Sequence, residues 1–255
     1  MNSEPLKPIL ISAQDARPGD LNGQSGAPLS CQIRGGHSLF LMGLNHQTAQ
    51  PYLQLLAGIE TPVSGEVLVL GNDCQTISPQ QLRELRRKVG FVLQGGPLLS
   101  VLNGFENLML PARYHQLGSE SERQEKAALL ISEFPHQANY RILPAYMSKL
   151  ERRLLAIARP LMLDPEVLFI DSPFDGLDQH DRVIIARYIS NIANHHPITL
   201  VICSDDLYFA HSLASQIIFC DLEKTFVFDN WQSFYECKHE TIALLFKHQV
   251  RSGNG

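Results

Sequence analysis

The stretch HSLFLMGLNHQTAQPYLQLLAGIE, residues 37–60, predicts a strand, a loop and a helix in immediate succession. Its first part is a short apolar run that ends at Gly43. Its last part places Leu53, Leu56 and Ile59 at helical spacing. A strand that runs through a glycine into a helix is the local frame of a phosphate-binding loop, G-x-x-x-x-G-K-[ST].

Parallel strands are expected on both sides of this frame. The runs EVLFID (166–171) and ITLVICSD (198–205) are continuously apolar and end in polar residues, which is typical of strands buried on both faces. The segment 78–94 predicts a basic helix followed by a strand, and residues from about 95 to 160 are helical in pattern. Ligands of such sheets lie at the carboxyl ends of the strands, where we expect Gly43, Gln94, Asp171 and Asp205.

Composition excludes several classes of protein. The chain has 255 residues, of which 44% are hydrophobic and 18% charged, and its net charge of −5 argues against nucleic acid as a partner. Its five cysteines form no C-x-x-C pair, so we expect neither a disulfide framework nor a zinc site, and a reducing cytoplasmic compartment. We also expect no signal peptide and no membrane span, so a role at a membrane needs a partner protein.

Five segments, in this order, resemble the ATP-binding subunit of an ABC transporter over residues 8–225. The resemblance implies an α/β P-loop ABC ATPase fold, with a mainly parallel RecA-like core sheet, an N-terminal antiparallel β subdomain and an inserted helical lobe. It places the β subdomain and core at about 1–94 and 161–225. The helical lobe then covers about 95–160, and residues 226–255 form a C-terminal extension.

The same resemblance implies ATP and magnesium as cofactors. It implies a membrane permease as partner, a homodimer or a heterodimer with another ABC ATPase, and a peripheral position on the inner face of the cytoplasmic membrane. The sequence does not identify the permease, the cargo or a sister subunit.

The phosphate loop departs from the family pattern. Gly43 and Asn45 lie in the loop, but Thr48, Ala49 and Gln50 fill the places of glycine, lysine and the magnesium-binding hydroxyl. If the loop shape is kept, the β-carbon of Thr48 costs ~1–3 kcal/mol, and Ala49 loses a contact worth ~1.5–3 kcal/mol. Their sum of ~4 kcal/mol is about a thousandfold in affinity. No Phe, Tyr or Trp precedes Phe40, so the aromatic that stacks on adenine is also missing.

The signature segment, LPAYMSKLERRLLAIARP (143–160), aligns with the L-S-G-G-Q motif that faces ATP held by the opposite subunit. Ser148 is retained, while Lys149, Leu150 and Glu151 replace the two glycines and the glutamine. We expect the two new side chains to obstruct a phosphate, unless Lys149 itself binds the phosphate in place of the lost charge.

The remaining motifs are partly retained. Gln94 stands at the Q-loop position, Asp171 at the magnesium position after the Walker B strand, and Asp178 in the D-loop. Ser172 replaces the general base, a group worth roughly 10²–10⁴ in rate, and Asp205 replaces the histidine that contacts the γ-phosphate. Two structural alternatives stay open: Gln94 as an ordinary strand-end glutamine, and Asp171 as an acceptor for buried backbone donors.

A narrower resemblance concerns the subtype. The run QGGPLL followed by Asn103, Phe105, Asn107 and Pro111, together with PFDGLD, is similar to the ATPases of MCE-type phospholipid transporters.

We therefore predict a degenerate cassette subunit that binds ATP weakly or not at all. It would dock on a permease as a structural or regulatory subunit, and in a heterodimer it would weaken both composite sites. One alternative is an active but unconventional ABC ATPase that powers transport. The other is a soluble scaffold that uses the ABC fold without a permease.

Overall fold

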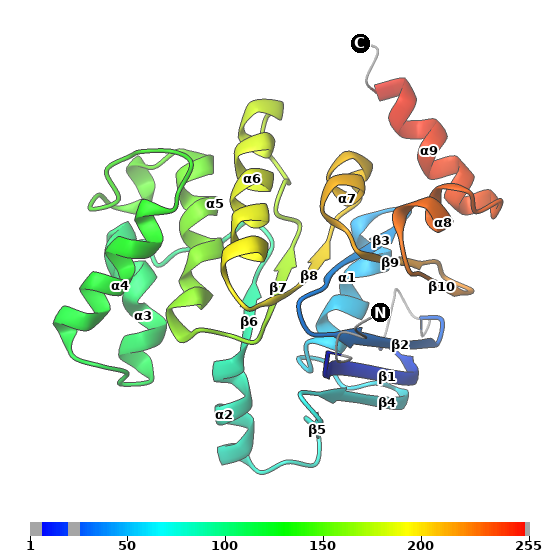
Figure 1. Cartoon of the computed structure of the whole chain (residues 1–255), viewed down its shortest axis with the longest axis horizontal. Coiled ribbons are helices and arrows are strands. Elements are labelled where there is room, and N and C mark those ends of the chain that lie inside the picture. Colours follow the sequence, from blue (N-terminus) through cyan, green and yellow to red (C-terminus); the bar gives the residue numbers. More distant parts are fainter. Residues whose placement is uncertain (1–6, 20–25, 253–255) are drawn as a thin grey trace, which may run out of the picture. The chain divides into compact units, whose positions relative to one another are not determined.

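The computed structural model describes residues 7–19 and 26–252, and its internal contacts divide the chain into two units. One unit joins Met1–Leu85 with Thr199–Gly255, and the other is Arg86–Ile198 (Figure 1). Most of the strands belong to the first unit, and the long helices α3 to α6 belong to the second.

An antiparallel sheet forms the N-terminal part of the first unit, in the order β2-β1-β4-β5. Its strands are β1 (Ile9–Arg17), β2 (Leu29–Arg34), β4 (Ser64–Val69) and β5 (Asn72–Asp73). Along β1 the side chains of Ile11 and Ala13 are buried, while Gln14 is exposed, as the two-residue period of a half-buried strand requires. The predicted N-terminal antiparallel subdomain is confirmed.

Parallel strands follow in the same unit. Strand β3 (Ser38–Gly43) lies between β8 (Thr199–Cys203) and β9 (Gln216–Cys220) and runs parallel to both. Strand β10 (Thr225–Phe228) returns antiparallel to β9. All five residues of β8 are buried, so the apolar run in the sequence is a central strand, as predicted.

Helix α1 (His46–Leu56) follows β3 directly and buries Tyr52, Leu53 and Leu56. The Tyr52 hydroxyl donates to the carbonyl of Ala27 at 2.8 Å, and burial raises the pKa of this phenol. The helix is therefore held against the chain that leads into β2.

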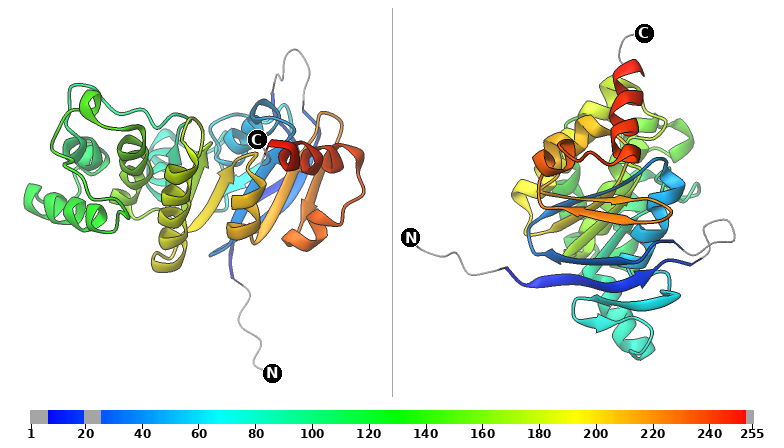
Figure 2. Two further views of the ribbon diagram at one scale, coloured as in Figure 1. Left: turned by 90° about the horizontal axis from the view of Figure 1, so that it is seen from above. Right: turned by 90° about the vertical axis from the view of Figure 1, so that its right-hand side faces the viewer.

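Three more helices complete the unit: α7 (Leu207–Leu213), α8 (Trp231–Tyr235) and α9 (Glu240–Ser252). Figure 2 shows α8 and α9 following the β10 strand. The Phe234 ring is fully buried, and it contacts Trp231 and Phe246 at centroid distances of 5.6 and 5.4 Å. These aromatic contacts attach the C-terminal segment to the strands.

The second unit pairs β6 (Val89–Val92) with β7 (Val167–Asp171) in parallel register. Helix α2 (Pro79–Lys88) leads into β6, and Lys88 forms an ion pair with Glu166 at 2.9 Å. The unit is wider than the helical lobe predicted for 95–160, because its contacts also include both strands and α6 (Gln179–His195). The lobe boundaries themselves stay a prediction.

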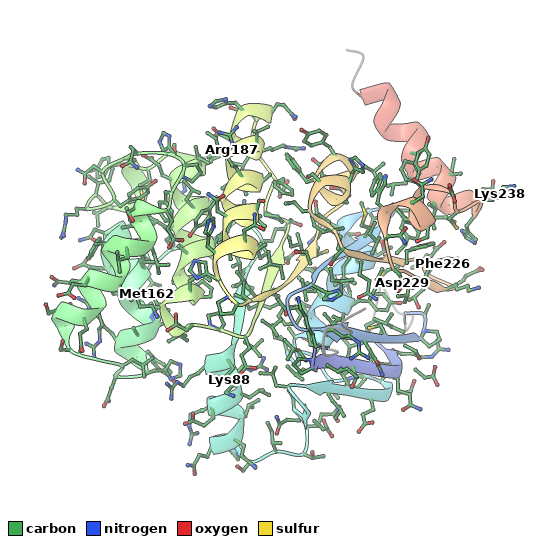
Figure 3. The ribbon with its side chains drawn as sticks, viewed as in Figure 1. Lys88, Met162, Arg187, Phe226, Asp229 and Lys238 are labelled. Carbon is green, nitrogen blue, oxygen red and sulfur yellow. The ribbon has the colours of Figure 1, made fainter. Side chains whose placement is uncertain are left out.

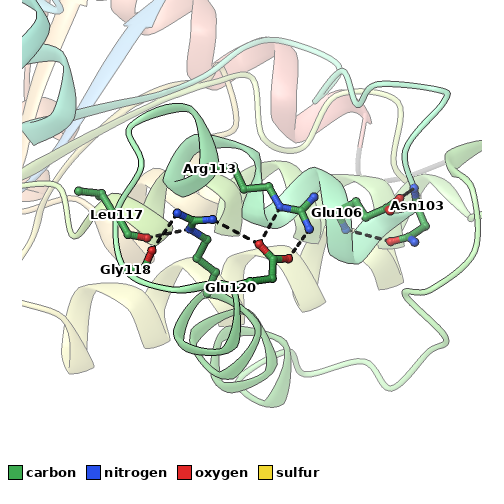
Figure 4. A network of polar contacts seen from close by, with 7 residues as sticks. Asn103, Glu106, Arg113, Leu117, Gly118 and Glu120 are labelled. Carbon is green, nitrogen blue, oxygen red and sulfur yellow. Dashed lines mark hydrogen bonds and ion pairs between the residues drawn. The ribbon is translucent and has the colours of Figure 1, made fainter.

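The other helices of this unit are α3 (Gly104–Tyr114), α4 (Glu120–Ser132) and α5 (Lys149–Ala158). Arg113 of α3 forms an ion pair with Glu120, which begins α4, and Arg123 donates to the carbonyls of Leu117 and Gly118, both at 2.8 Å (Figure 4). The Arg113 side chain holds the pKa of Glu120 below its usual range. These contacts define the turn between α3 and α4.

A buried amide organises the loop before α3. Asn107 is fully buried, and its oxygen accepts from the Leu99 N–H at 2.7 Å. Its amide nitrogen lies within hydrogen-bond distance of three carbonyls, those of Leu99, Leu102 and Asn103. The loop is thus shaped by one side chain that satisfies several backbone groups.

Within the described residues, 7–19 and 26–252, no helix has both the length and the apolar character needed to cross a bilayer.

We expect Asn107→Ala to lower the free energy of unfolding by ~1–3 kcal/mol, because the Leu99 N–H and the Leu102 carbonyl lose the hydrogen bonds that they make to this buried amide. Urea denaturation measures this loss. The matched control is Asn139→Ala, whose amide oxygen accepts one exposed hydrogen bond from the Arg141 N–H, and which should change stability by less than about 1 kcal/mol. Equal losses in the two variants would contradict this role of Asn107.

Candidate functional site

The loop after β3 is folded as the start of a helix. Strand β3 ends at Gly43, and α1 begins at His46, two residues before Thr48. Asn45 is the N-cap residue: its side-chain oxygen accepts from the Thr48 N–H at 3.1 Å, and its carbonyl accepts from the Thr48 hydroxyl at 2.8 Å. A phosphate in such a loop is held by the same class of N–H group, so a phosphate would compete with the Asn45 side chain for the Thr48 N–H.

Thr48 also fills the space over Gly43. A β-carbon at Gly43 would lie 2.2 Å from the Thr48 hydroxyl oxygen, so only glycine fits beneath it. Thr48 has no left-handed backbone conformation, so the strain expected for a retained loop shape is not incurred. Thr48 lies instead in the first turn of α1.

The two residues after Thr48, which are Ala49 and Gln50, carry no positive charge. Ala49 is 2% exposed and packs inside, and Gln50 is half-buried. A lysine introduced at position 49 alone would clash with the residues packed around Ala49, and its ammonium group would have to reach solvent.

Asp205 follows the end of β8 and is exposed. The neighbouring Asp206 is the N-cap of α7, where its carboxylate accepts from the N–H groups of Tyr208 and Phe209 at 3.1 and 3.3 Å. In this unit Gly43 and Asp205 therefore lie at carboxyl ends of parallel strands, as expected.

The start of α5, in the other unit, is closed by a capping box. The Ser148 hydroxyl accepts from the Glu151 N–H at 3.1 Å, and the Glu151 carboxylate accepts from the Ser148 N–H at 2.6 Å. Leu150 is buried and Lys149 is exposed. That these two side chains obstruct a phosphate stays a prediction. The Lys149 ammonium donates to the carbonyl of Gly176 at 3.3 Å.

The turn after β7 contains Asp171 and Ser172. Asp171 ends the strand and is 1% exposed, and the Ser172 hydroxyl donates to its carboxylate at 3.3 Å. Ser172 has a φ of 46°, the left-handed region that few residues other than glycine adopt. The alternative role of Asp171 as an acceptor for buried backbone donors stays a prediction.

Arg153 of α5 binds this turn from inside the unit. Its guanidinium is 5% exposed and donates to the carbonyls of Ser172 and Asp175 at 2.6 and 3.2 Å. Burial lowers the pKa of Arg153, and the nearby carboxylates of Asp175 and Asp171 oppose that shift. The sequence motifs do not identify Arg153 and Asp175, because neither residue stands at a motif position that binds nucleotide or magnesium.

Gln94 contacts the turn after β7, and Asp178 is the last residue of that turn. Gln94 follows β6 and donates from its side-chain amide to the Asp175 carboxylate at 3.3 Å. Asp178 is the N-cap of α6 and accepts from the Asp181 N–H at 2.9 Å. The second unit thus brings Gln94, Asp171, Ser172, Lys149 and Asp178 onto or beside one turn, residues 172–178.

Comparisons with known proteins identify the family and the fold. The sequence model of the family described as ABC transporter matches residues 27–175. This chain belongs to the ABC transporter family. Its fold is the P-loop ABC ATPase fold, as predicted, and it is similar to the dimeric structure of MJ0796, a bacterial ABC transporter cassette. That similarity has a TM-score of 0.74 at 21% identity, over 85% of this chain and 97% of the other.

Curated relatives of this ABC chain include the lipoprotein-releasing system ATP-binding protein LolD of Bdellovibrio bacteriovorus. It is 34% identical over 71% of this chain and 83% of that protein. The intermembrane phospholipid transport system ATP-binding protein MlaF of Haemophilus influenzae is 26% identical over 73% of this chain and 70% of that protein. The ABC family is therefore confirmed, and the phospholipid subgroup stays a prediction.

In the loop of this ABC chain the Thr48 N–H and hydroxyl are both bonded to Asn45, and we predict weak phosphate binding for that reason. We expect the triple variant Thr48→Gly, Ala49→Lys, Gln50→Ser to bind ATP about ten- to a hundredfold more tightly than the native chain, because it restores the charged contact and the hydroxyl and removes the Thr48 side chain from over Gly43. Calorimetry with Mg-ATP measures both affinities. Gln47→Ser, at an exposed residue of the same helix, is the control and should change nothing. Micromolar binding by the native chain would contradict the argument.

Proposed function

We propose that this chain is the cassette subunit of an ABC transporter and that it docks on a membrane permease through an apolar surface of its second unit. That surface, here named the apolar loop surface, consists of Leu99, Val101, Leu143 and Tyr146. Val101 and Tyr146 are 81% and 77% exposed. Clustered exposed apolar side chains of this kind mark protein interaction sites.

Two loops form the apolar loop surface, and both are held in place. The Gly104 N–H donates to the carbonyl of Ile142 at 3.1 Å, which joins the loop before α3 to the loop before α5. Asn107 fixes the first loop, and Arg152 donates to the carbonyls of Pro144 and Met147 to fix the second. A preformed apolar surface loses little conformational entropy when a partner helix binds it.

We propose further that nucleotide binding is weak and that the subunit acts structurally or as a regulator. Both helix starts at which the family binds phosphate are capped from within, by Asn45 in α1 and by Ser148 with Glu151 in α5. The Glu151 carboxylate adds a negative charge where a phosphate would lie, and Ser172 supplies no general base.

The second candidate is an ATPase that powers transport. The relatives favour it, because LolD and MlaF are both named ATP-binding proteins. Asp171 and Gln94 are also present at their expected strand ends, where a carboxylate and an amide suit magnesium as oxygen ligands. Lys149 would then have to leave the Gly176 carbonyl to supply the missing charge.

ATP turnover separates these two candidates. For the structural subunit we expect no ATP hydrolysis above background, either by the chain alone or by its complex with the permease. The control is Asp171→Asn, which should leave that background unchanged. Turnover that depends on Asp171 would establish the ATPase instead.

We propose further that the transported cargo is a phospholipid. It is supported by the MlaF relative and by Asn103 and Asn107, which the sequence shares with the subgroup pattern. Both asparagines shape the loop before α3, so they also have a purely structural role. A peripheral position on the cytoplasmic face of the membrane follows from docking on a permease.

We expect Val101→Glu combined with Tyr146→Glu to reduce recovery of a permease from solubilised host membranes at least tenfold, because charges replace the apolar contact at its centre. Affinity purification with mass spectrometry measures recovery. Leu129→Glu is the control, since Leu129 is 66% exposed on α4 and lies outside the apolar loop surface. If the native chain recovers no integral membrane protein, the soluble scaffold is the correct alternative.

A further inference from the structure

Arginine side chains hold both loops of the apolar loop surface. Arg152 of α5 donates to the carbonyls of Pro144 and Met147 at 3.1 and 2.6 Å. Arg159, which directly follows α5, donates to the carbonyl of Pro97 at 3.1 Å. Both arginines are half-buried. A guanidinium has five N–H groups, so each side chain keeps donors beyond these contacts.

Arg141 is a third cation beside the same loops. Its side chain is exposed, and its guanidinium lies over the Phe105 ring, 4.4 Å from the ring centroid. The Phe105 N–H donates to the carbonyl of Tyr140 at 2.9 Å, so this cation lies where the two loops meet.

These three arginines have no anionic partner in the described part of the chain, residues 7–19 and 26–252, where none of them forms an ion pair. The loop segments 95–102 and 140–147 contain no acidic residue. The first acidic residues after them, Glu106 and Glu151, accept from backbone N–H groups at helix starts, at 2.9 and 2.6 Å. The apolar loop surface is therefore bordered by positive charge, although the chain has a net charge of −5.

Arg159 shows the cost of this arrangement. Burial lowers its pKa, because a partly desolvated guanidinium without an anion is unfavourable. A carboxylate brought in by a partner would supply the missing anion, and hydrogen bonds between a guanidinium and a carboxylate are among the strong ones in proteins. The charges thus favour an acidic partner.

The spacing of two arginines indicates the form of that partner. The helical backbone of α5 continues through Arg159, so Arg152 and Arg159 are two turns apart on one face. Two turns of helix advance ~10 Å along the axis. A partner helix that lies along α5 presents its own side chains two turns apart at the same spacing.

We propose that the apolar loop surface binds an amphipathic helix with two carboxylates, two turns apart, beside its apolar stripe. The apolar stripe lies on Val101 and Tyr146, and the carboxylates lie at Arg152 and Arg159. Arg141 adds positive charge at the same surface. The proposal rests on the docking surface proposed above and adds the chemistry of the partner.

The test is calorimetry of the full chain with three helical peptides of about 15 residues, roughly four turns. All three carry the same leucine stripe, and the two positions beside it carry glutamate, glutamine or lysine. At about 50 mM salt we expect the glutamate peptide to bind at least tenfold more tightly than the glutamine peptide, and the lysine peptide to bind least. At about 500 mM salt the preference for glutamate should fall below about threefold, because salt screens these charges.

Variants of the two arginines locate the effect. Arg152→Gln and Arg159→Gln should each reduce the preference for glutamate about threefold, whereas Arg152→Lys and Arg159→Lys keep the charge and should retain most of it. Arg187→Gln is the control and should change nothing, since Arg187, labelled in Figure 3, is exposed on α6 and lies outside the apolar loop surface.

Equal binding of the three peptides would overturn the acidic partner and leave the apolar docking surface in place. No binding of any peptide at up to about 1 mM would also overturn this proposal, and recovery of a permease from membranes then decides the proposed docking separately. The comparison of peptides uses the native chain, so it holds even if a variant does not fold.

Discussion

Backbone N–H groups at a helix start must find an acceptor, and in this chain the acceptors belong to the protein itself. Asn45 fills this role for α1, and Ser148 with Glu151 fills it for α5. A helix start that is satisfied from within is stable without a ligand. The protein itself therefore stabilises the start of both helices.

The turn 172–178 is also stabilised by hydrogen bonds from other residues of the protein. The buried Arg153 guanidinium binds two of its carbonyls, Lys149 binds a third, and Gln94 binds the Asp175 side chain. In this way residues at motif positions have become parts of an internal hydrogen-bond network. The apolar loop surface, which is fixed by Asn107 and Arg152, lies in the same unit as this network.

Most of the fold could be predicted from hydrophobic patterns, because the apolar runs that became β3, β7 and β8 are long and uninterrupted. The start of α1 at His46 could not be predicted, since it depends on Asn45 competing with the loop conformation of the family. Arg153 could not be predicted either. Its burial depends on carbonyls nineteen and twenty-two residues away, and no local pattern reports such a contact.

The burial of Ala49 beside a capped helix start has an evolutionary consequence. A lysine substituted at this position alone would enter a packed part of the helix, where burying its charge costs stability. The benefit appears only after Thr48 has also given way to a residue that frees the loop. We therefore expect positions 48 and 49 to change together, rather than one at a time, in sequences descended from this chain.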